Sequence, residues 1–160
     1  MRFLLPKTIA LLISFLAYCG YNTNKKTTIS SDMYTLTVKR GGYHNYMFQL
    51  IGNSIFYFPD STDVKTIERF NVSSVTPLEK KVVDSFFSKL ESERFWTLNE
   101  RYRTDTSCSS SIEITLEHDG RSKTVFCEDF GRDCPDLIKY IDQSIVVFEG
   151  NDLKWTFLPG

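Results

Sequence analysis

An Asp-Gly pair between two alternating segments constrains the fold of this chain more than any other feature. Residues 112–118 (Ile-Glu-Ile-Thr-Leu-Glu-His) alternate between apolar and polar side chains, and residues 121–127 (Arg-Ser-Lys-Thr-Val-Phe-Cys) would place Val125 and Cys127 on the same face as Ile112 and Ile114. The Asp-Gly at 119–120 joins them, and this dipeptide favours two-residue turns in which both residues take a positive φ. The sequence therefore predicts a β-hairpin in which His118 lies opposite Arg121.

Earlier segments predict further strands. Residues 33–39 alternate cleanly, as expected for a half-buried strand, and turn residues separate this segment from the ones that follow. The chain holds 13 Phe and 8 Tyr, which bury large areas and favour strands, so we expect a core rich in sheet. The predicted strands before the hairpin cover residues 33–39, 46–50, 54–58 and 64–72.

Two segments have helical periodicity instead. In Thr76-Pro-Leu-Glu79, Thr fits the N-cap, Pro the first helical position and Glu the third. A second helix is expected to begin in 133–136 (Asp-Cys-Pro-Asp) and to stop at Gly150. Residues 153–157 alternate and predict a short last strand. The predicted fold is α+β, with an antiparallel sheet of about four strands plus the hairpin, covered on one face by two helices. The apolar stripes consist of Leu78, Val82, Val83, Phe86, Phe87 and Leu90 in the first helix and Leu137, Ile141, Ile145 and Phe148 in the second.

The N-terminus has the layout of a secretory signal peptide. Arg2 and Lys7 precede an apolar run from Thr8 to Tyr18. That run is about half of the roughly 20 apolar residues that a membrane-spanning helix needs. We therefore predict a signal peptide at residues 1–18.

The end of this apolar run resembles the lipobox of bacterial lipoproteins. Leu16, Ala17 and Cys19 match the motif, whereas Tyr18 stands where Gly, Ala or Ser is usual. The resemblance implies diacylglycerol and further acylation at Cys19, a membrane anchor that needs no spanning helix because more than one chain is attached. Simple secretion is the alternative.

These assignments divide the chain into three parts. The lipidated cysteine begins a polar, flexible tether at residues 19–32, and one α+β domain fills 33–160. Removal of the signal peptide takes away two cations and lowers the formal net charge from −1 to −3. This charge does not favour nucleic acid. We expect an exported protein anchored to a membrane of the bacterial cell envelope, with an envelope protein as its partner.

Three cysteines remain after the lipid-bearing one, so an oxidising compartment allows one disulfide. The hairpin register places Cys127 opposite Ile112, on the apolar face, where it is expected as a buried thiol. Cys108 and Cys134 both lie past the open end of the hairpin. We therefore predict a bridge between Cys108 and Cys134. A metal site formed by the three cysteines and His118 does not fit the spacing of zinc motifs.

The order of segments also resembles an uncharacterised lipoprotein domain family of unknown function. In that family a strand pair precedes a helix, and a Tyr-rich segment precedes a hairpin that contains Asp. The family often carries a Cys-Gly-x-Cys-Pro turn after its first strand, and this chain has Arg-Gly-Gly-Tyr-His-Asn at 40–45 instead. The resemblance implies no mechanism. The matching positions are residues 34–38, residues 76–90, Tyr102, Asp105 and residues 112–127.

Three groups of residues are candidates for chemistry. His44, in a polar loop, could bind a ligand or act as a base. A cluster of carboxylates at positions 128, 129, 133 and 136 could bind a hard cation such as calcium, although two of them suit a helix N-terminus. Arg and aromatic residues are enriched at protein interfaces. The predicted recognition surface consists of Trp96, Arg101, Tyr102 and Arg103.

The sequence contains no catalytic set, cofactor motif or metal motif that we can assign. We therefore expect a non-enzymatic binding module of the cell envelope. The alternatives are an envelope hydrolase whose site combines residues distant in sequence, such as His44 and the acidic cluster, and a purely structural protein. A deep pocket that joins His44 to carboxylates would favour the enzyme. A flat sheet face or an exposed aromatic patch would favour binding.

Overall fold

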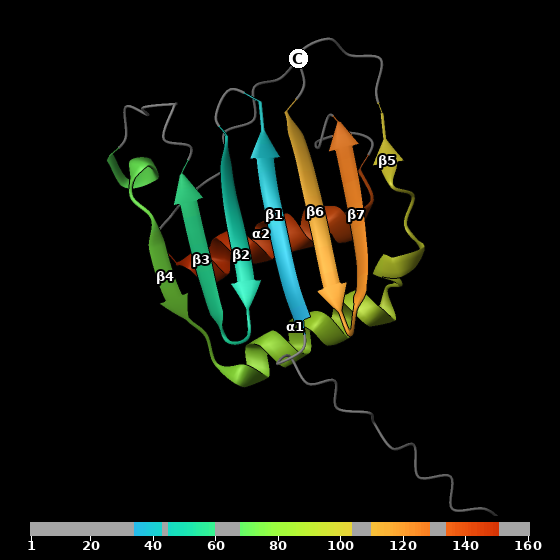
Figure 1. The fold of residues 1–160 in the computed structure, drawn as a ribbon, viewed down its shortest axis with the longest axis horizontal. Coiled ribbons are helices and arrows are strands. Elements are labelled where there is room, and N and C mark those ends of the chain that lie inside the picture. The colour runs from blue at the N-terminus through green and yellow to red at the C-terminus, as the bar shows by residue number, and fades with distance from the viewer. Residues whose placement is uncertain (1–33, 43–44, 60–67, 104–109, 129–133, 151–160) are drawn as a thin grey trace, which may run out of the picture.

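A computed structural model describes residues 34–42, 45–59, 68–103, 110–128 and 134–150. They form one seven-stranded sheet in the order β4-β3-β2-β1-β6-β7-β5, with two α-helices behind it (Figure 1). The α+β class and the coverage of one face by two helices are confirmed, and the sheet is larger than predicted. The strands are β1 (Tyr34–Gly41), β2 (Tyr46–Ile51), β3 (Ser54–Pro59), β4 (Ser74–Pro77), β5 (Arg101–Tyr102), β6 (Ser111–His118) and β7 (Arg121–Glu128).

The predicted hairpin is present with the predicted register. β6 and β7 pair antiparallel from His118↔Arg121 to Ser111↔Glu128. Asp119 and Gly120 have φ values of 50° and 73°, as the two-residue turn requires. β6 also pairs antiparallel with β1, which makes β1 the centre of the sheet.

The region around residues 64–77 differs from the prediction. Residues 60–67 lie outside the described residues, and Glu68–Asn71 forms a 3₁₀-helix rather than the end of a strand. The fourth strand is Ser74–Pro77, which pairs with β3. The predicted capping box is wrong, because the Thr76 hydroxyl donates to the carbonyl of Glu149 at 3.0 Å instead of capping a helix.

Helix α1 (Lys80–Ser92) therefore begins later than predicted, with Glu79 as its N-cap. Val82 is 39% exposed and does not belong to the buried stripe. Helix α2 (Asp136–Glu149) ends as predicted at Gly150, whose φ of 77° suits glycine. The buried residues of the two helices are Val83, Phe86, Phe87 and Leu90 in α1 and Leu137, Ile138, Ile141, Asp142, Ile145 and Glu149 in α2.

Alternation along the strands explains where the core lies. Successive side chains of a strand point to opposite faces, and the inward set is largely apolar in β1, β2, β3 and β6. In β1 this set is Tyr34, Leu36 and Val38, followed by Arg40. The helices also contact each other, because the ring of Phe86 packs against those of Tyr140 and Phe148 at 5.8 and 5.3 Å.

A charged network joins the last inward position of β1 to α2. Arg40 and Asp142 are 2% and 4% exposed, and they form a buried ion pair. The Arg40 Nε–H donates to the Asp142 carboxylate at 2.6 Å, and Nη1 donates to the Tyr46 hydroxyl at 3.1 Å. Burial raises the pKa of Asp142, and the Arg40 guanidinium opposes this rise. The pair therefore ties α2 to the centre of the sheet.

Three predicted features lie outside the described residues. They are the signal peptide with the lipid-bearing Cys19, the tether, and the last strand at 153–157. Among the described residues, neither helix is long and apolar enough to span a membrane.

Replacing Arg40 tests the role of this ion pair. Arg40→Met leaves a buried carboxylate without its cation, which should lower the free energy of unfolding by about 3–5 kcal/mol at pH 7. Without the cation, the pKa of Asp142 in the folded state rises further above its value in the unfolded state. The folded variant then keeps a proton that the unfolded chain has released. Its free energy of unfolding relative to the wild type therefore falls as the pH rises above about 4.

The measurement is urea denaturation at pH 4 and pH 7. Lys39→Met is the matched control, because the ion pair between Lys39 and Glu113 is exposed and should contribute less than about 1 kcal/mol. Equal losses in the two variants, or a larger loss for Arg40→Met at pH 4 than at pH 7, would contradict the assignment.

Candidate functional site

The face of the sheet opposite the helices, here called the outer face, carries the candidate site. Figure 1 shows both helices behind the sheet, and no described element covers the front. The outward side chains of neighbouring strands line up in two rows, because the strand pairs place them opposite one another. The first row is Val75, Phe56, Gln49, Thr37, Thr115 and Thr124. The second row is Phe58, Met47, Lys39, Glu113, Phe126 and Arg101.

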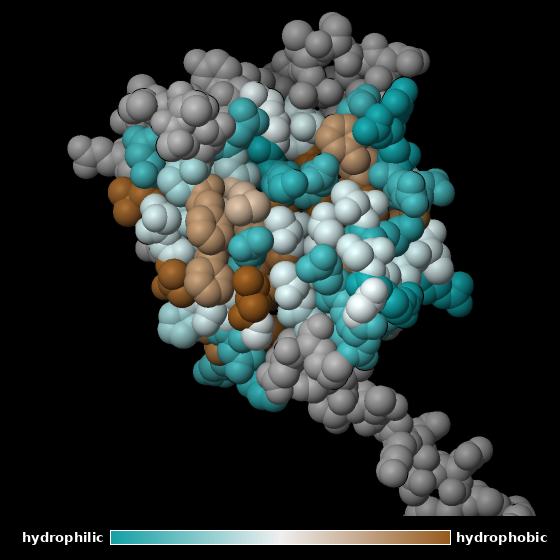
Figure 2. Space-filling view, viewed as in Figure 1, coloured by the Kyte–Doolittle hydropathy of each residue, from teal (hydrophilic) through white to brown (hydrophobic). Residues whose placement is uncertain are grey.

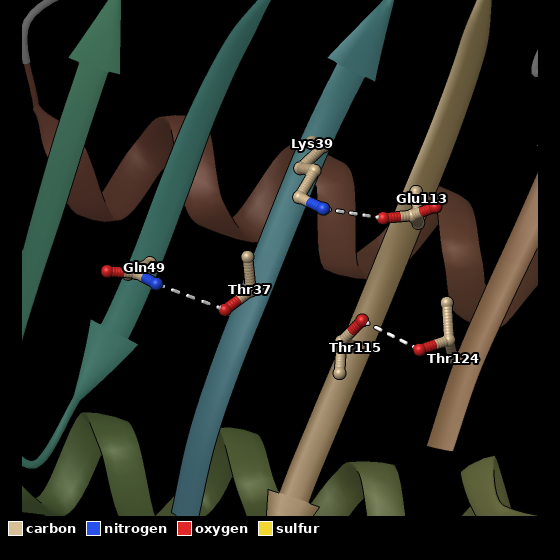
Figure 3. A network of polar contacts seen from close by, with 6 residues as sticks. All are labelled: Thr37, Lys39, Gln49, Glu113, Thr115 and Thr124. Atoms are coloured by element: carbon tan, nitrogen blue, oxygen red, sulfur yellow. Dashed lines mark hydrogen bonds and ion pairs between the residues drawn. The ribbon is translucent and has the colours of Figure 1, made fainter. Parts of the chain in front are cut away.

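Polar contacts fix the middle of both rows (Figure 3). Lys39 and Glu113 form an ion pair at 2.9 Å, and the hydroxyls of Thr115 and Thr124 lie 2.8 Å apart. The amide of Gln49 donates to the Thr37 hydroxyl at 3.4 Å. These cross-strand contacts hold polar side chains flat on the sheet, so the centre of the outer face is ordered and hydrophilic.

Apolar side chains gather at the β3–β4 end of this face (Figure 2). Phe56 stacks on Phe58 with 6.3 Å between ring centroids. Phe58, Ile51 and Val75 are 37%, 44% and 61% exposed. An exposed apolar patch of this kind on a folded protein marks surfaces that bind a partner.

Two open grooves lie on the outer face and at its β7 edge. The central groove, of about 490 Å³, lies over β1, β2, β3 and β6 and includes Met47, Phe58 and Ser111. The edge groove, of about 860 Å³, lies along the outer edge of β7. Glu113 and Phe126 line both grooves, so the two grooves adjoin each other. The edge groove is lined by Trp96, Glu100, Arg101, Glu113, Arg121, Ser122, Lys123, Thr124 and Phe126.

The wall of the edge groove is the short 3₁₀-helix η3 (Phe95–Thr97), which follows α1. Arg94, with φ of 61°, turns the chain between the two helices. The indole N–H of Trp96 then donates to the Glu91 carboxylate at 2.7 Å, and the Tyr34 hydroxyl donates to the same oxygen at 2.9 Å. Burial, and then this carboxylate, raise the pKa of the Tyr34 phenol. Glu91 therefore fixes the ring of Trp96 relative to the sheet.

Two guanidinium groups lie on aromatic rings in this groove. Arg121 sits over the Trp96 ring at 4.2 Å, and Arg101 sits over the Phe126 ring at 5.0 Å. Stacking of this kind holds a guanidinium in one plane and leaves its N–H groups available for a carboxylate or phosphate. Neither Arg has an ion pair with another described residue.

The predicted recognition surface is brought together only in part. Trp96 and Arg101 line the edge groove. Tyr102 instead packs against the core, and its hydroxyl accepts the backbone N–H of Asn99 at 3.1 Å. Arg103 is exposed and does not line the groove.

Sequence reasoning missed the contribution of the hairpin. Glu113, Thr124 and Phe126 could have been found, since they occupy the outward positions of the predicted strands. The stacking of Arg121 on Trp96 could not, because no local pattern relates residues 25 positions apart.

The other candidate sites receive no support from the described residues. His44, Asp129 and Asp133 lie outside them. His118 stacks on Tyr34 at 3.7 Å and lines neither groove. In the part of the chain that the structure describes, no three His, Cys, Asp or Glu side chains come together to hold a metal ion.

The disulfide differs from the prediction. Cys134, just before α2, is joined to Cys127 in β7, with 6.0 Å between their Cα atoms. The predicted partner of Cys134 was therefore wrong, as was a free thiol at Cys127, while Cys108 lies outside the described residues. Only seven positions separate the bonded cysteines. The bridge ties the start of α2 to the strand that forms the floor of the edge groove.

No known family model matches the sequence, and no match is found among curated proteins.

The cysteine pairing can be tested by two-step alkylation. The unfolded, unreduced protein is labelled first with one reagent, then reduced and labelled with a second. We expect the second label on Cys127 and Cys134 and the first label on Cys108. A second label on Cys108 would contradict this pairing. Reduction of the native bridge should also lower the free energy of unfolding by about 2–3 kcal/mol. The bridge closes a short loop, and it thereby restricts the conformations of the unfolded chain.

Proposed function

We propose that this protein is a non-enzymatic binding module of the bacterial cell envelope. In this proposal lipid on Cys19 anchors it to a membrane, residues 20–32 act as a tether, and the outer face of the sheet binds an envelope protein. The lipobox-like N-terminus supports the anchor.

The observation that carries the binding role is the open outer face. A sheet face left without covering helices normally carries polar side chains, as the centre of this face does. Here the same rows continue into exposed Phe58 and Val75 at one end and into stacked Arg101 at the other. Apolar and Arg side chains around an ordered polar centre are the composition of a protein interface.

The shape of the grooves supports binding rather than catalysis. Both are open to solvent and lie on the outer face of the sheet or at its edge, in contrast to the enclosed pockets that bind small substrates. Their walls present stacked cations, aromatic rings and the paired Lys39 and Glu113. Such side chains can recognise the surface of another protein, and this recognition requires no catalytic group.

Site-specific photocrosslinking in intact cells tests the binding role. A photoreactive amino acid at Thr124, on the outer face, should capture one dominant protein. The same amino acid at Val147, which is 75% exposed on α2, is the control and should not capture it. Arg121→Glu should reduce capture from Thr124 about tenfold, since it reverses a charge in the edge groove. Equal capture from both positions, or capture unaffected by Arg121→Glu, would refute a specific interface here.

Fractionation tests the anchor separately. Cys19→Ser removes the acyl acceptor, so the protein should leave the membrane fraction. Cys108→Ser is the matched control and should remain in it. If Cys19→Ser stays in the membrane fraction at the level of the wild type, the protein is not anchored through this residue.

A further inference from the structure

The outer edge of β7 is covered along only part of its length. β5 pairs with β7 in parallel at two positions, Arg101↔Phe126 and Tyr102↔Cys127. Before Arg101 the chain runs away from β7 toward η3, which forms the far wall of the edge groove (Figure 1). The segment of β7 from Arg121 to Thr124 therefore faces a groove where a neighbouring strand would lie.

The direction of the backbone groups along this segment follows from one hydrogen bond. The N–H of Phe126 donates to the carbonyl of Glu100 at 2.8 Å, so the peptide groups of Phe126 point away from β6. In an antiparallel pair this direction recurs at every second residue. The N–H and C=O groups of Thr124 and Ser122 consequently point into the edge groove. No described residue provides a backbone partner for them there.

Charges in the groove favour an anionic occupant. Arg101, Arg121 and Lys123 line it together with two carboxylates, Glu100 and Glu113. Glu113 is already neutralised by Lys39 at 2.9 Å, so cations predominate. The strand register places the two stacked guanidinium groups on opposite faces of the sheet, since Arg121 pairs with the inward His118 and Arg101 with the outward Phe126. An extended segment between them would meet a cation on each side.

We propose that the edge groove binds an extended peptide segment with acidic side chains, which adds to the sheet as a strand beside residues 121–124. Added strands gain affinity from backbone hydrogen bonds and specificity from alternate side chains. In this complex the backbone of Ser122 and Thr124 pairs with the peptide, and its carboxylates meet Arg121 and Arg101. A second copy of this edge is disfavoured, because it carries the same cations. This inference rests on the proposed binding function and identifies the chemistry of the partner.

The test uses the purified protein and a defined probe, the fluorescent peptide acetyl-Val-Asp-Asp-Val-Asp-Asp-Val-amide, whose neighbouring Asp residues present carboxylates on both faces of an added strand. It should bind saturably, and the same peptide with Lys in place of Asp should not. Thr124→Pro removes the N–H that points into the groove, and proline is tolerated at such edge positions. It should weaken binding about tenfold relative to Thr124→Val, which loses the hydroxyl but keeps the N–H. Thermal unfolding of both variants shows whether the fold is retained.

A second measurement leaves the protein unchanged. Methylation of alternate backbone nitrogens of the acidic peptide removes its own donors on one edge. Methylation on one of the two alternating sets should abolish binding, whereas methylation on the other should not. Amide exchange of Ser122 and Thr124 should slow when the unmodified peptide is bound.

Absence of saturable binding, or equal binding of the acidic and Lys peptides, would overturn the inference. Equal binding to Thr124→Pro and Thr124→Val, or to both methylated peptides, would also overturn it. These results are distinguishable from failure of the proposed function. Capture of one partner from Thr124 in cells, combined with no strand addition in these assays, would leave a binding module whose partner is recognised by side chains alone.

Discussion

The buried ion pair between Arg40 and Asp142 is the interaction on which the two-layer arrangement depends. β1 is the central strand, and Arg40 occupies the position where its inward row of apolar side chains ends. An unpaired guanidinium there would be costly, so α2 must supply a carboxylate at this point of the sheet. The pair therefore specifies the point at which α2 crosses β1. Apolar contacts alone would define this crossing point less well. The rings of Tyr46 and Phe48, 5.4 and 5.3 Å from the guanidinium carbon, complete the surroundings.

Much of this fold could be predicted from the sequence where the signals are local. The Asp-Gly turn fixed the register of β6 and β7, and alternation located β1, β2 and β3. Features that depend on distant residues were missed. The Thr76-Pro-Leu-Glu79 segment fits an N-cap, yet in the folded protein Thr76 donates to Glu149 at the end of α2, and Pro77 ends an edge strand. β5 has only two residues and no period of its own, so nothing in the sequence indicates that it pairs with β7.

The residues of the candidate site divide in the same way, into those that local signals predict and those that depend on distant contacts. Trp96 and Arg101 were predicted from composition, because Trp and Arg are common at interfaces, and both line the edge groove. Tyr102 is directed toward the core because it lies opposite Cys127, on the inward side of β7. The same geometry explains the disulfide. Cys127 faces the helices, so it can reach Cys134 just before α2. The sequence does not indicate this proximity, because it relates the second helix to the hairpin only by distance along the chain.

The two edges of the sheet differ in how far they are covered, and the β7 edge is the more accessible one. At the β4 edge, Ser74 and Thr76 both bond to Glu149, so the strand is held to α2, and Pro77 removes one donor. At the β7 edge, β5 covers only the last part of the strand, and Arg121 and Lys123 flank the remainder. Charged side chains on an open edge oppose pairing with an identical edge. They do not oppose pairing with a strand of opposite charge. The β7 edge thus discourages self-association while it keeps backbone groups accessible, a combination suited to selective binding of an acidic segment.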